Sequence, residues 1–335
     1  MKITVITEGG KKVGFGHLTR CIAISQELKR RNIRVEFIVN GDNSILNLLK
    51  GFDFRMFNWI KCAKRLFKEI AKADFIIIDS YLANKKLYSD LSKKMNGRML
   101  MIDDYYRLDY PKGIVVNPSV QGNSLKYRRF KGVKYLLGKD YVILRDAALN
   151  APKKVINREI KSVMLTFGGA DRKNLTAKLL RILQSYCPRI NKIVVIGRGF
   201  KSIERIEEIA DKMINLEYYP EAEKMIKLML NSDVAISAGG QTLYELARIG
   251  VPTIGICVSD NQAGNILGLE REGFLKYAGR PEDINFTGNV IQAISELKEF
   301  SVRKNMSKTG QKLFDGKGAK RITSEILKLS KEGKR

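Results

Sequence analysis

Residues 2–20 read K-I-T-V-I-T-E-G-G-K-K-V-G-F-G-H-L-T-R and pass from a strand pattern to a helix pattern. Residues 2–7 have the β-branched composition of a buried strand, and residues 18–31 have the apolar spacing of an amphipathic helix. Glycines in the turn between them allow a ligand to approach the backbone closely, and the free N–H groups of a helix N-terminus favour anions. The stretch therefore predicts a strand–turn–helix unit with a phosphate site at its turn.

His17, the single histidine of the chain, lies in this turn. Histidine is the side chain whose unperturbed pKa is closest to neutral, which suits a group that accepts and releases protons. A capping or surface histidine is the alternative interpretation. The glycines on its N-terminal side favour a proton carrier beside a phosphate.

The composition is that of a globular protein. The chain has 335 residues, of which 44% are hydrophobic and 29% charged, enough for two domains with separate cores. We find no signal-peptide pattern and no run of about 20 apolar residues, so we expect a cytoplasmic protein without a transmembrane segment. A monomer is the expected oligomeric state.

The four cysteines are scattered through the chain, at Cys21, Cys62, Cys187 and Cys257. With a single histidine and no C-x-x-C pair, they argue against a structural zinc site and against a disulfide framework. We therefore expect buried thiols, no metal and no cofactor.

The formal net charge of +26 raises the possibility of a nucleic-acid partner. The basic residues are nevertheless spread along the chain, and the densest run, K-Y-R-R-F-K-G-V-K at residues 126–134, is short. No nucleic-acid-binding motif is present, so we expect no specific nucleic-acid partner. A positive field that concentrates an anionic small substrate and a lysine-rich surface without a partner are both consistent with this charge.

Strand and helix patterns alternate along the whole chain. Strands are expected at residues 2–7, 35–39, 75–79, 99–102, 114–117, 163–167, 193–196, 216–218, 234–237 and 253–257. Helices are expected at residues 18–31, 43–50, 60–73, 85–95, 174–186, 203–211, 222–231, 242–248, 262–272, 291–297 and 319–329. Such βαβ connections predict an α/β protein with doubly wound, mostly parallel sheets.

A polar stretch with one proline, residues 145–161, predicts a linker between two Rossmann-like domains that face a cleft. We place the first domain at residues 1–150 and the second at residues 151–335. A return of the last helix to the first domain is the alternative. Ligands of such sheets bind at the carboxyl ends of the strands, so motifs that end strands are the candidates for function.

Two further strand ends carry polar residues or glycines. Asp79, Ser80 and Tyr81 follow a buried strand, where a tyrosine can hydrogen-bond a ligand or pack as a wall of the cleft. The run L-T-F-G-G-A-D-R-K-N-L-T, residues 165–176, joins a strand to a helix through two glycines. Asp171 or Asn174 is expected to cap that helix, which leaves the glycine amides for a phosphate.

The run I-S-A-G-G-Q-T-L-Y-E-L-A, residues 236–247, opens another helix with glycines. Glu245 in its first turn either stabilises the helix dipole or accepts two hydrogen bonds from a ribose diol. Asp260, Asn261 and Gln262 then follow a buried strand, as a helix cap or as ligands of a sugar. Taken together, the strand-end motifs indicate a bound diphosphate and sugar. Because neither the P-loop motif nor the strict dinucleotide fingerprint occurs, a P-loop ATPase and a nicotinamide-binding protein are disfavoured.

The chain resembles a family that includes the nucleotide-sugar hydrolase of pseudaminic acid biosynthesis and spore-coat polysaccharide proteins. The resemblance covers nearly the whole chain. It rests on G-F-G-H-L-T-R-C (residues 14–21), I-I-D-S-Y (77–81), M-I-D-D (101–104), F-G-G-A-D-R-K-N-L-T (167–176), S-A-G-G-Q-T-L-Y-E-L (237–246) and S-D-N-Q (259–262). The chain departs from the family pattern in T-E-G-G-K-K, which lacks an Asp-Ser pair, and in Gly239-Gly240-Gln241, which replaces a serine-rich turn.

The resemblance implies the GT-B fold and metal-independent hydrolysis of a UDP-linked 2,4-diacetamido-2,4,6-trideoxy sugar, with inversion at the anomeric carbon. It implies that His17 is the general base. The residues expected to bind the substrate are Gly14, Gly16, Arg20, Tyr81, Asn261 and Gln262. Those expected to bind the nucleotide are Gly168, Gly169, Gly239, Gly240, Gln241 and Glu245. The alternatives are a GT-B glycosyltransferase with a UDP-sugar donor and a basic nucleic-acid-binding protein.

Overall fold

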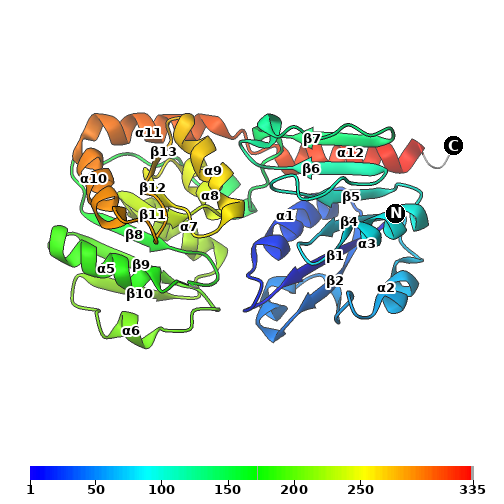
Figure 1. Ribbon diagram of the computed structural model, residues 1–335, viewed down its shortest axis with the longest axis horizontal. Coiled ribbons are helices and arrows are strands. Elements are labelled where there is room, and N and C mark those ends of the chain that lie inside the picture. Colours follow the sequence, from blue (N-terminus) through cyan, green and yellow to red (C-terminus); the bar gives the residue numbers. More distant parts are fainter. Residues whose placement is uncertain (172, 333–335) are drawn as a thin grey trace. The chain divides into compact units, whose positions relative to one another are not determined.

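The computed structural model describes residues 1–171 and 173–332 (Figure 1). The chain divides into two compact units, Met1–Leu144 with Gly316–Arg335, and Arg145–Asp315. The first unit thus ends near the predicted boundary at residue 150. It also contains α12, Gly318–Glu332, the helix that the sequence analysis assigned to the second domain with a return to the first as the alternative.

The first unit is built on a seven-stranded sheet with the order β3-β2-β1-β4-β5-β6-β7. All neighbouring strands are parallel. The strands are β1 (Lys2–Gly9), β2 (Arg34–Gly41), β3 (Asp53–Met56), β4 (Phe75–Asp79), β5 (Met99–Ile102), β6 (Gly113–Asn117) and β7 (Val133–Leu137). The central strands form continuous apolar runs because helices cover both faces of the sheet.

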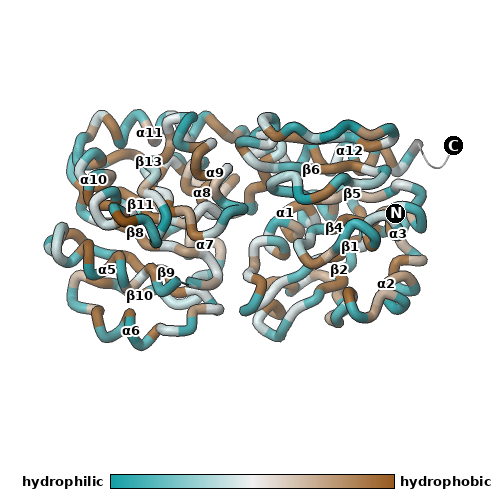
Figure 2. Tube along the Cα trace, viewed as in Figure 1, coloured by the Kyte–Doolittle hydropathy of each residue, from teal (hydrophilic) through white to brown (hydrophobic). Residues whose placement is uncertain are grey.

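Helices on the two faces of this sheet bury separate clusters. On one face, Ile3 and Val5 of β1 pack in one cluster with residues of α1 (Gly16–Arg30) and α12. On the other face, Ile6 packs with residues of α2 (Ala63–Ile70) and α3 (Lys85–Lys94). In Figure 2 the central strands are largely brown, whereas α12 alternates between brown and teal as an amphipathic helix does.

The second unit is built on a six-stranded parallel sheet with the order β10-β9-β8-β11-β12-β13. Its strands are β8 (Ser162–Thr166), β9 (Asn191–Ile196), β10 (Ile214–Tyr218), β11 (Val234–Ala238), β12 (Thr253–Ile256) and β13 (Leu275–Tyr277). Its helices are α4 (Asp146–Leu149), α5 (Leu175–Tyr186), α6 (Glu204–Glu207), α7 (Ala222–Asn231), α8 (Thr242–Ile249), α9 (Asp260–Arg271), α10 (Phe286–Lys298) and α11 (Phe300–Leu313). The predicted class, two doubly wound parallel α/β domains, is confirmed.

Strands β3, β7 and β13 and helix α11 were not predicted from the sequence. Two predicted helices differ from the observed ones, one in length and one in type. β3, β7 and β13 are edge strands that carry polar or exposed residues, so they lack the buried-strand pattern. Residues 203–211 form only the short helix α6, and residues 43–50 form a 3₁₀ helix, Asn43–Leu49. Arg172, which lies in one of the quoted motifs, is outside the described residues, as are residues 333–335.

Each sheet has a point at which the strand order reverses. In the first unit this point lies between β1 and β4, and in the second unit between β8 and β11. In doubly wound sheets the carboxyl ends of such strand pairs form the binding crevice. The predicted site motifs follow these strands: the first glycine turn follows β1, Tyr81 follows β4, and the two later glycine pairs follow β8 and β11.

Candidate active site

The turn after β1 is a tight loop closed by the backbone. Gly10 and Gly14 exchange two N–H···O hydrogen bonds of 2.9 and 2.8 Å. Gly10 has φ +137°, and a Cβ atom there would lie 2.4 Å from Oδ2 of Asp42. Gly14 also has a positive φ, +89°, but a Cβ atom on it or on Gly16 would meet no atom within 4 Å. The turn therefore requires glycine at Gly10 for packing, while Gly14 and Gly16 leave open space beside His17.

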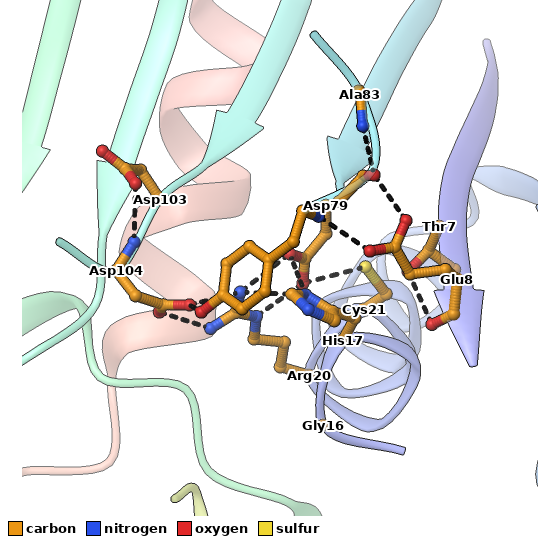
Figure 3. Close-up of polar contacts among 12 residues, drawn as sticks. Thr7, Glu8, Gly16, His17, Arg20, Cys21, Asp79, Ala83, Asp103 and Asp104 are labelled. Carbon is orange, nitrogen blue, oxygen red and sulfur yellow. Dashed lines mark hydrogen bonds and ion pairs between the residues drawn. The ribbon is translucent and has the colours of Figure 1, made fainter. Parts of the chain in front are cut away.

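His17 lies in the first turn of α1 and is 9% exposed. Its Nδ1 atom is 2.6 Å from Oδ1 of Asp79, the last residue of β4, and Figure 3 shows the two side chains pointing at each other. Nη2 of Arg20 is also near Nδ1, at 3.2 Å, but that guanidinium nitrogen already donates to Asp79. Nδ1 therefore carries a proton that it donates to Asp79, and Nε2 is left as the proton acceptor of the neutral ring.

The electrostatics of this pair favour a protonated histidine and an ionised aspartate. Burial lowers the pKa of His17, but the charge and hydrogen bond of Asp79 outweigh burial and raise that pKa above its usual value. Burial raises the pKa of Asp79, but Arg20 and His17 outweigh it and hold that pKa well below its usual range. Asp79 is consequently a fixed negative charge beside the imidazole.

Arg20 is one helical turn from His17, on the same face of α1, and binds two carboxylates. It donates to Asp79 from Nε and Nη2, at 2.5 and 2.7 Å, and to Asp104 from Nη1 and Nη2, at 2.6 and 3.0 Å. The sequence analysis predicted that Arg20 binds the substrate. In the structure its guanidinium group instead holds the carboxylate that orients His17, and a contact with substrate remains a prediction.

Tyr81 connects this network to the loop after β4. Its ring meets the ring of His17 edge to face, with 4.4 Å between centroids, and its hydroxyl donates to Asp104. Its backbone N–H donates to Oε1 of Glu8 at 2.7 Å, and the hydroxyl of Ser80 donates to the other oxygen of the same carboxylate. Glu8, at the end of β1, is buried, so it fixes the loop that positions Tyr81.

The roles of Glu8, Asp79 and Asp104 were missed by the sequence analysis. Each is an acidic residue at or just after a strand, in β1, β4 and β5, and these strands are neighbours in the sheet. The three residues could have been predicted to lie together from the strand order of a doubly wound sheet, which places the C-terminal ends of these three strands side by side. Cys21 is buried 3.8 Å from Asp79, and burial raises the pKa of its thiol well above the usual value. Cys187 and Cys257 are also buried, but Cys62 is exposed, so the expectation of buried thiols was wrong for Cys62.

In the second unit, the Gly168-Gly169 turn follows β8. Asp171 caps α5, because its carboxylate accepts from the N–H groups of Leu175 and Thr176 at 2.9 and 2.7 Å. Asn174 stands at the start of that helix with a left-handed φ of 50° and makes no capping bond, so of the two expected caps only Asp171 acts. Gly168 has φ +71°, with no atom within 4 Å of an added Cβ.

The second glycine pair of this unit divides into a packed and an open residue. A Cβ atom on Gly239 would lie 2.7 Å from Cβ of Gln262, whereas one on Gly240 would meet nothing within 4 Å. Oε1 of Gln262, a residue of α9, accepts from the N–H of Gly239 at 3.1 Å and so connects this turn to α9. At the start of α8, the N–H groups of Leu243 and Tyr244 donate to the backbone oxygens of Gly240 and Gln241, at 3.1 Å each. Binding of an anion at this turn remains a prediction.

Glu245 is 1% exposed in the first turn of α8. Both of its oxygens accept from Arg145, which donates from Nε and Nη2 at 2.5 Å each. The sequence analysis placed Arg145 in the linker and missed this bidentate pair. Asn261, the remaining predicted residue, accepts from the hydroxyl of Ser259 at 2.6 Å. Binding of ribose by Glu245 and of sugar by Asn261 remain predictions.

Two general features of the described residues bear on the site. Within residues 1–171 and 173–332, no three His, Cys, Asp or Glu side chains are grouped as metal ligands. In the same ranges no helix combines the length and the apolar character required to cross a bilayer.

The comparisons with known proteins agree with this architecture. Residues 163–322 match the glycosyltransferase family 28 C-terminal domain. The chain is 23% identical to the spore coat polysaccharide biosynthesis protein SpsG of Bacillus subtilis, over 98% of both proteins. It is 25% identical to the pseudaminic acid cytidylyltransferase and UDP-2,4-diacetamido-2,4,6-trideoxy-beta-L-altropyranose hydrolase of Helicobacter pylori, over 82% of this chain and 48% of that protein.

A further relative, an uncharacterized protein of Methanocaldococcus jannaschii, is 26% identical over 76% of this chain and 55% of its own length. The chain thus spans about half the length of two of these relatives and almost all of SpsG. Among solved structures, MurG of Acinetobacter baumannii is similar with a TM-score of 0.69 and 15% identity, over 98% of this chain and 100% of MurG.

A co-structure of S. aureus MnaA with UDP is similar with a TM-score of 0.66 and 14% identity, over 97% of this chain and 96% of that one. The identities are too low to carry more than the fold, which the parallel sheets of both units support independently. The match of residues 163–322 to the family 28 domain and the two named relatives indicate a glycosyltransferase-like enzyme. The chain has the GT-B fold and resembles the family that contains spore-coat polysaccharide biosynthesis proteins and the UDP-sugar hydrolase of pseudaminic acid biosynthesis.

Proposed function

We propose that this protein is a cytoplasmic enzyme that hydrolyses a UDP-linked 2,4-diacetamido-2,4,6-trideoxy sugar, with His17 as the general base. The observation that carries the proposal is the buried His17–Asp79 pair, in which Nδ1 is held 2.6 Å from a carboxylate oxygen. This arrangement fixes the tautomer that leaves Nε2 as an acceptor, as a base requires. The name of the Helicobacter pylori relative supports the choice of substrate.

The proposed step transfers a proton from water to Nε2 of His17. The water oxygen forms a bond with the anomeric carbon, while the bond from that carbon to the phosphate oxygen breaks and UDP leaves with its electron pair. Attack from the face opposite to UDP inverts the configuration. Asp79 remains ionised and stabilises the imidazolium, which then releases its proton to solvent. As the family resemblance implies, no metal takes part.

The two units have different roles in this proposal. Gly14, Gly16 and Tyr81 of the first unit contact the sugar, and Asn261 and Gln262 of the second unit stay predicted sugar ligands. The nucleotide is bound by the second unit through Gly168, Gly169, Gly239, Gly240, Gln241 and Glu245. Two features support this division: an added Cβ on Gly168 or Gly240 would meet no atom within 4 Å, and α8 begins directly after the second glycine pair, where a helix dipole favours a diphosphate.

A GT-B glycosyltransferase is the second candidate function, favoured by the match of residues 163–322 to the family 28 transferase domain. In that case His17 deprotonates a hydroxyl of an acceptor sugar instead of water. The two reactions are separated by incubation of the protein with UDP-sugars, with and without acceptor sugars. UDP release without an acceptor supports hydrolysis. Release that requires an acceptor supports the transferase and contradicts our proposal.

A further inference from the structure

The loop after β5 presents an aromatic ring beside the His17 network. Asp103 is buried and organises this loop, because its carboxylate accepts from the N–H groups of Asp104 and Arg107, at 2.9 and 3.2 Å. The hydroxyl of Tyr127 donates to the same carboxylate at 2.6 Å. These bonds restrain the backbone on both sides of Tyr105.

The side chain of Tyr105 is 39% exposed although it lies close to the buried histidine. Its ring contacts the ring of Tyr81 at 5.8 Å between centroids, with 68° between planes. Tyr81 in turn contacts His17 at 4.4 Å. The three rings form a continuous series that begins at the proposed base and ends at an exposed aromatic surface. Within the described residues the Tyr105 hydroxyl has no hydrogen-bond partner, so no polar contact accounts for its position.

A fixed, exposed aromatic ring is suited to contact the apolar parts of a sugar. Tyrosine offers a large contact area and loses little conformational entropy on binding, because few of its bonds rotate. The groups of a sugar that gain by leaving water for such a ring are methyl groups, as in an acetamido or a 6-deoxy substituent, whereas a hydroxyl group would lose hydrogen bonds.

We propose that Tyr105 is a specificity-determining residue, whose ring contacts a methyl-bearing substituent of the sugar and so selects acetamido sugars over their hydroxylated counterparts. This inference rests on the proposed function for one point, that the sugar is bound next to His17. It does not depend on whether water or another sugar accepts the glycosyl group.

The test compares Tyr105→Ala with two controls. Tyr105→Phe retains the ring and removes only the hydroxyl. Phe54→Ala removes another aromatic ring of the first unit, one that is 38% exposed on edge strand β3. UDP release is measured with UDP-N-acetylglucosamine and with UDP-glucose, which has a hydroxyl where the first has an acetamido group. UDP alone is measured as an inhibitor, and melting temperature reports folding.

We expect Tyr105→Ala to lower the ratio of kcat/KM for the acetamido sugar over the hydroxylated sugar by about 10–100-fold, mainly through KM. Inhibition by UDP should not change, and both controls should behave as the wild type. An unchanged ratio in folded Tyr105→Ala would overturn the inference. An equal loss for both sugars would also overturn it, because it would indicate a general disturbance of the loop.

A wild-type protein that releases UDP from neither sugar turns over neither of them, which contradicts neither the proposed function, whose substrate is a 2,4-diacetamido sugar, nor the role of Tyr105. Saturation-transfer NMR of UDP-N-acetylglucosamine then reports binding directly. Saturation transfer from the protein to the acetamido methyl group in the wild type and Tyr105→Phe, but not in Tyr105→Ala, supports the inference. Absence of transfer to that methyl group in the wild type overturns it.

Discussion

The two points of strand reversal have the same topology, but charged side chains follow the strands at one and glycines follow the strands at the other. At the carboxyl ends of β1 and β4, buried charged side chains form a connected network around His17 and Asp79. At the ends of β8 and β11, an added Cβ on Gly168 or Gly240 would meet no atom within 4 Å, and the buried carboxylate of Glu245 pairs with the half-buried Arg145. We interpret the first of these strand ends as suited to proton transfer and the second as suited to binding an anion. The same fold supports both because its function depends on the residues that follow its strands.

The sharpest test of this difference is His17→Asn, which removes the proton acceptor of the first unit and leaves the second unit unchanged. We expect turnover to fall by about 10²–10⁴-fold, the usual contribution of a general base. Affinity for UDP should remain that of the wild type. Steady-state kinetics and calorimetric titration with UDP measure the two quantities. Near-normal turnover in the folded variant would remove His17 from the mechanism.

The role of Asp79 is tested by Asp79→Asn and by pH. Because His17 must be neutral to act, activity of the wild type should rise with pH through the raised pKa of His17. Asp79→Asn removes the charge that raises this pKa, so the rise should move to lower pH, and kcat should fall by about 10²-fold. Asp104→Asn is the comparison variant, because Asp104 makes no hydrogen bond to His17 and contributes the smallest of the causes that raise the pKa of His17, so a smaller shift is expected. An equal change in both variants would contradict the assignment of Asp79.

The raised pKa of His17 predicts that stability and activity change with pH in opposite directions. A group whose folded-state pKa is raised contributes stability that is fully present below its unfolded pKa, about 6.5, and is lost as pH rises through the folded pKa. The free energy of unfolding of the wild type should thus decrease over the window in which its activity increases. Chemical unfolding at several pH values measures this, with His17→Asn as the variant that should lose the decrease. A decrease that persists in His17→Asn would assign it to another group.

In the second unit, Glu245→Ala should weaken UDP binding by about 1.5–3 kcal/mol, the range for a hydrogen bond to a charged group. The variant should also be less stable, because it leaves Arg145 without its carboxylate partner. The double variant Arg145→Met/Glu245→Leu should regain stability without regaining UDP affinity. Recovery of UDP affinity in the double variant would show that the pair has only a structural role.

The smallest expected effects separate the two glycines of the same turn. Gly239→Ala should cost about 1–3 kcal/mol of stability, because its Cβ atom would lie 2.7 Å from Gln262. Gly240→Ala meets no atom and should leave stability almost unchanged, while a nucleotide bound at this backbone would lose affinity. Thermal unfolding and UDP titration of both variants decide this. Unchanged UDP affinity in Gly240→Ala would place the diphosphate elsewhere.

The fold class could be predicted from the sequence alone, because buried parallel strands are continuous apolar runs that local periodicity reveals, as at β4 and β11. His17 and the glycine turns stood out as candidates, since these features are local. Edge strands such as β7 were missed because they lack a buried face. The partners of His17 and Glu245 became known from the tertiary structure alone. Asp79 lies 62 positions from His17, Asp104 lies 84 positions from Arg20, and Arg145 lies 100 positions from Glu245. These contacts follow from the order of strands in a sheet and from the packing of helices onto it, which no local pattern of residues encodes.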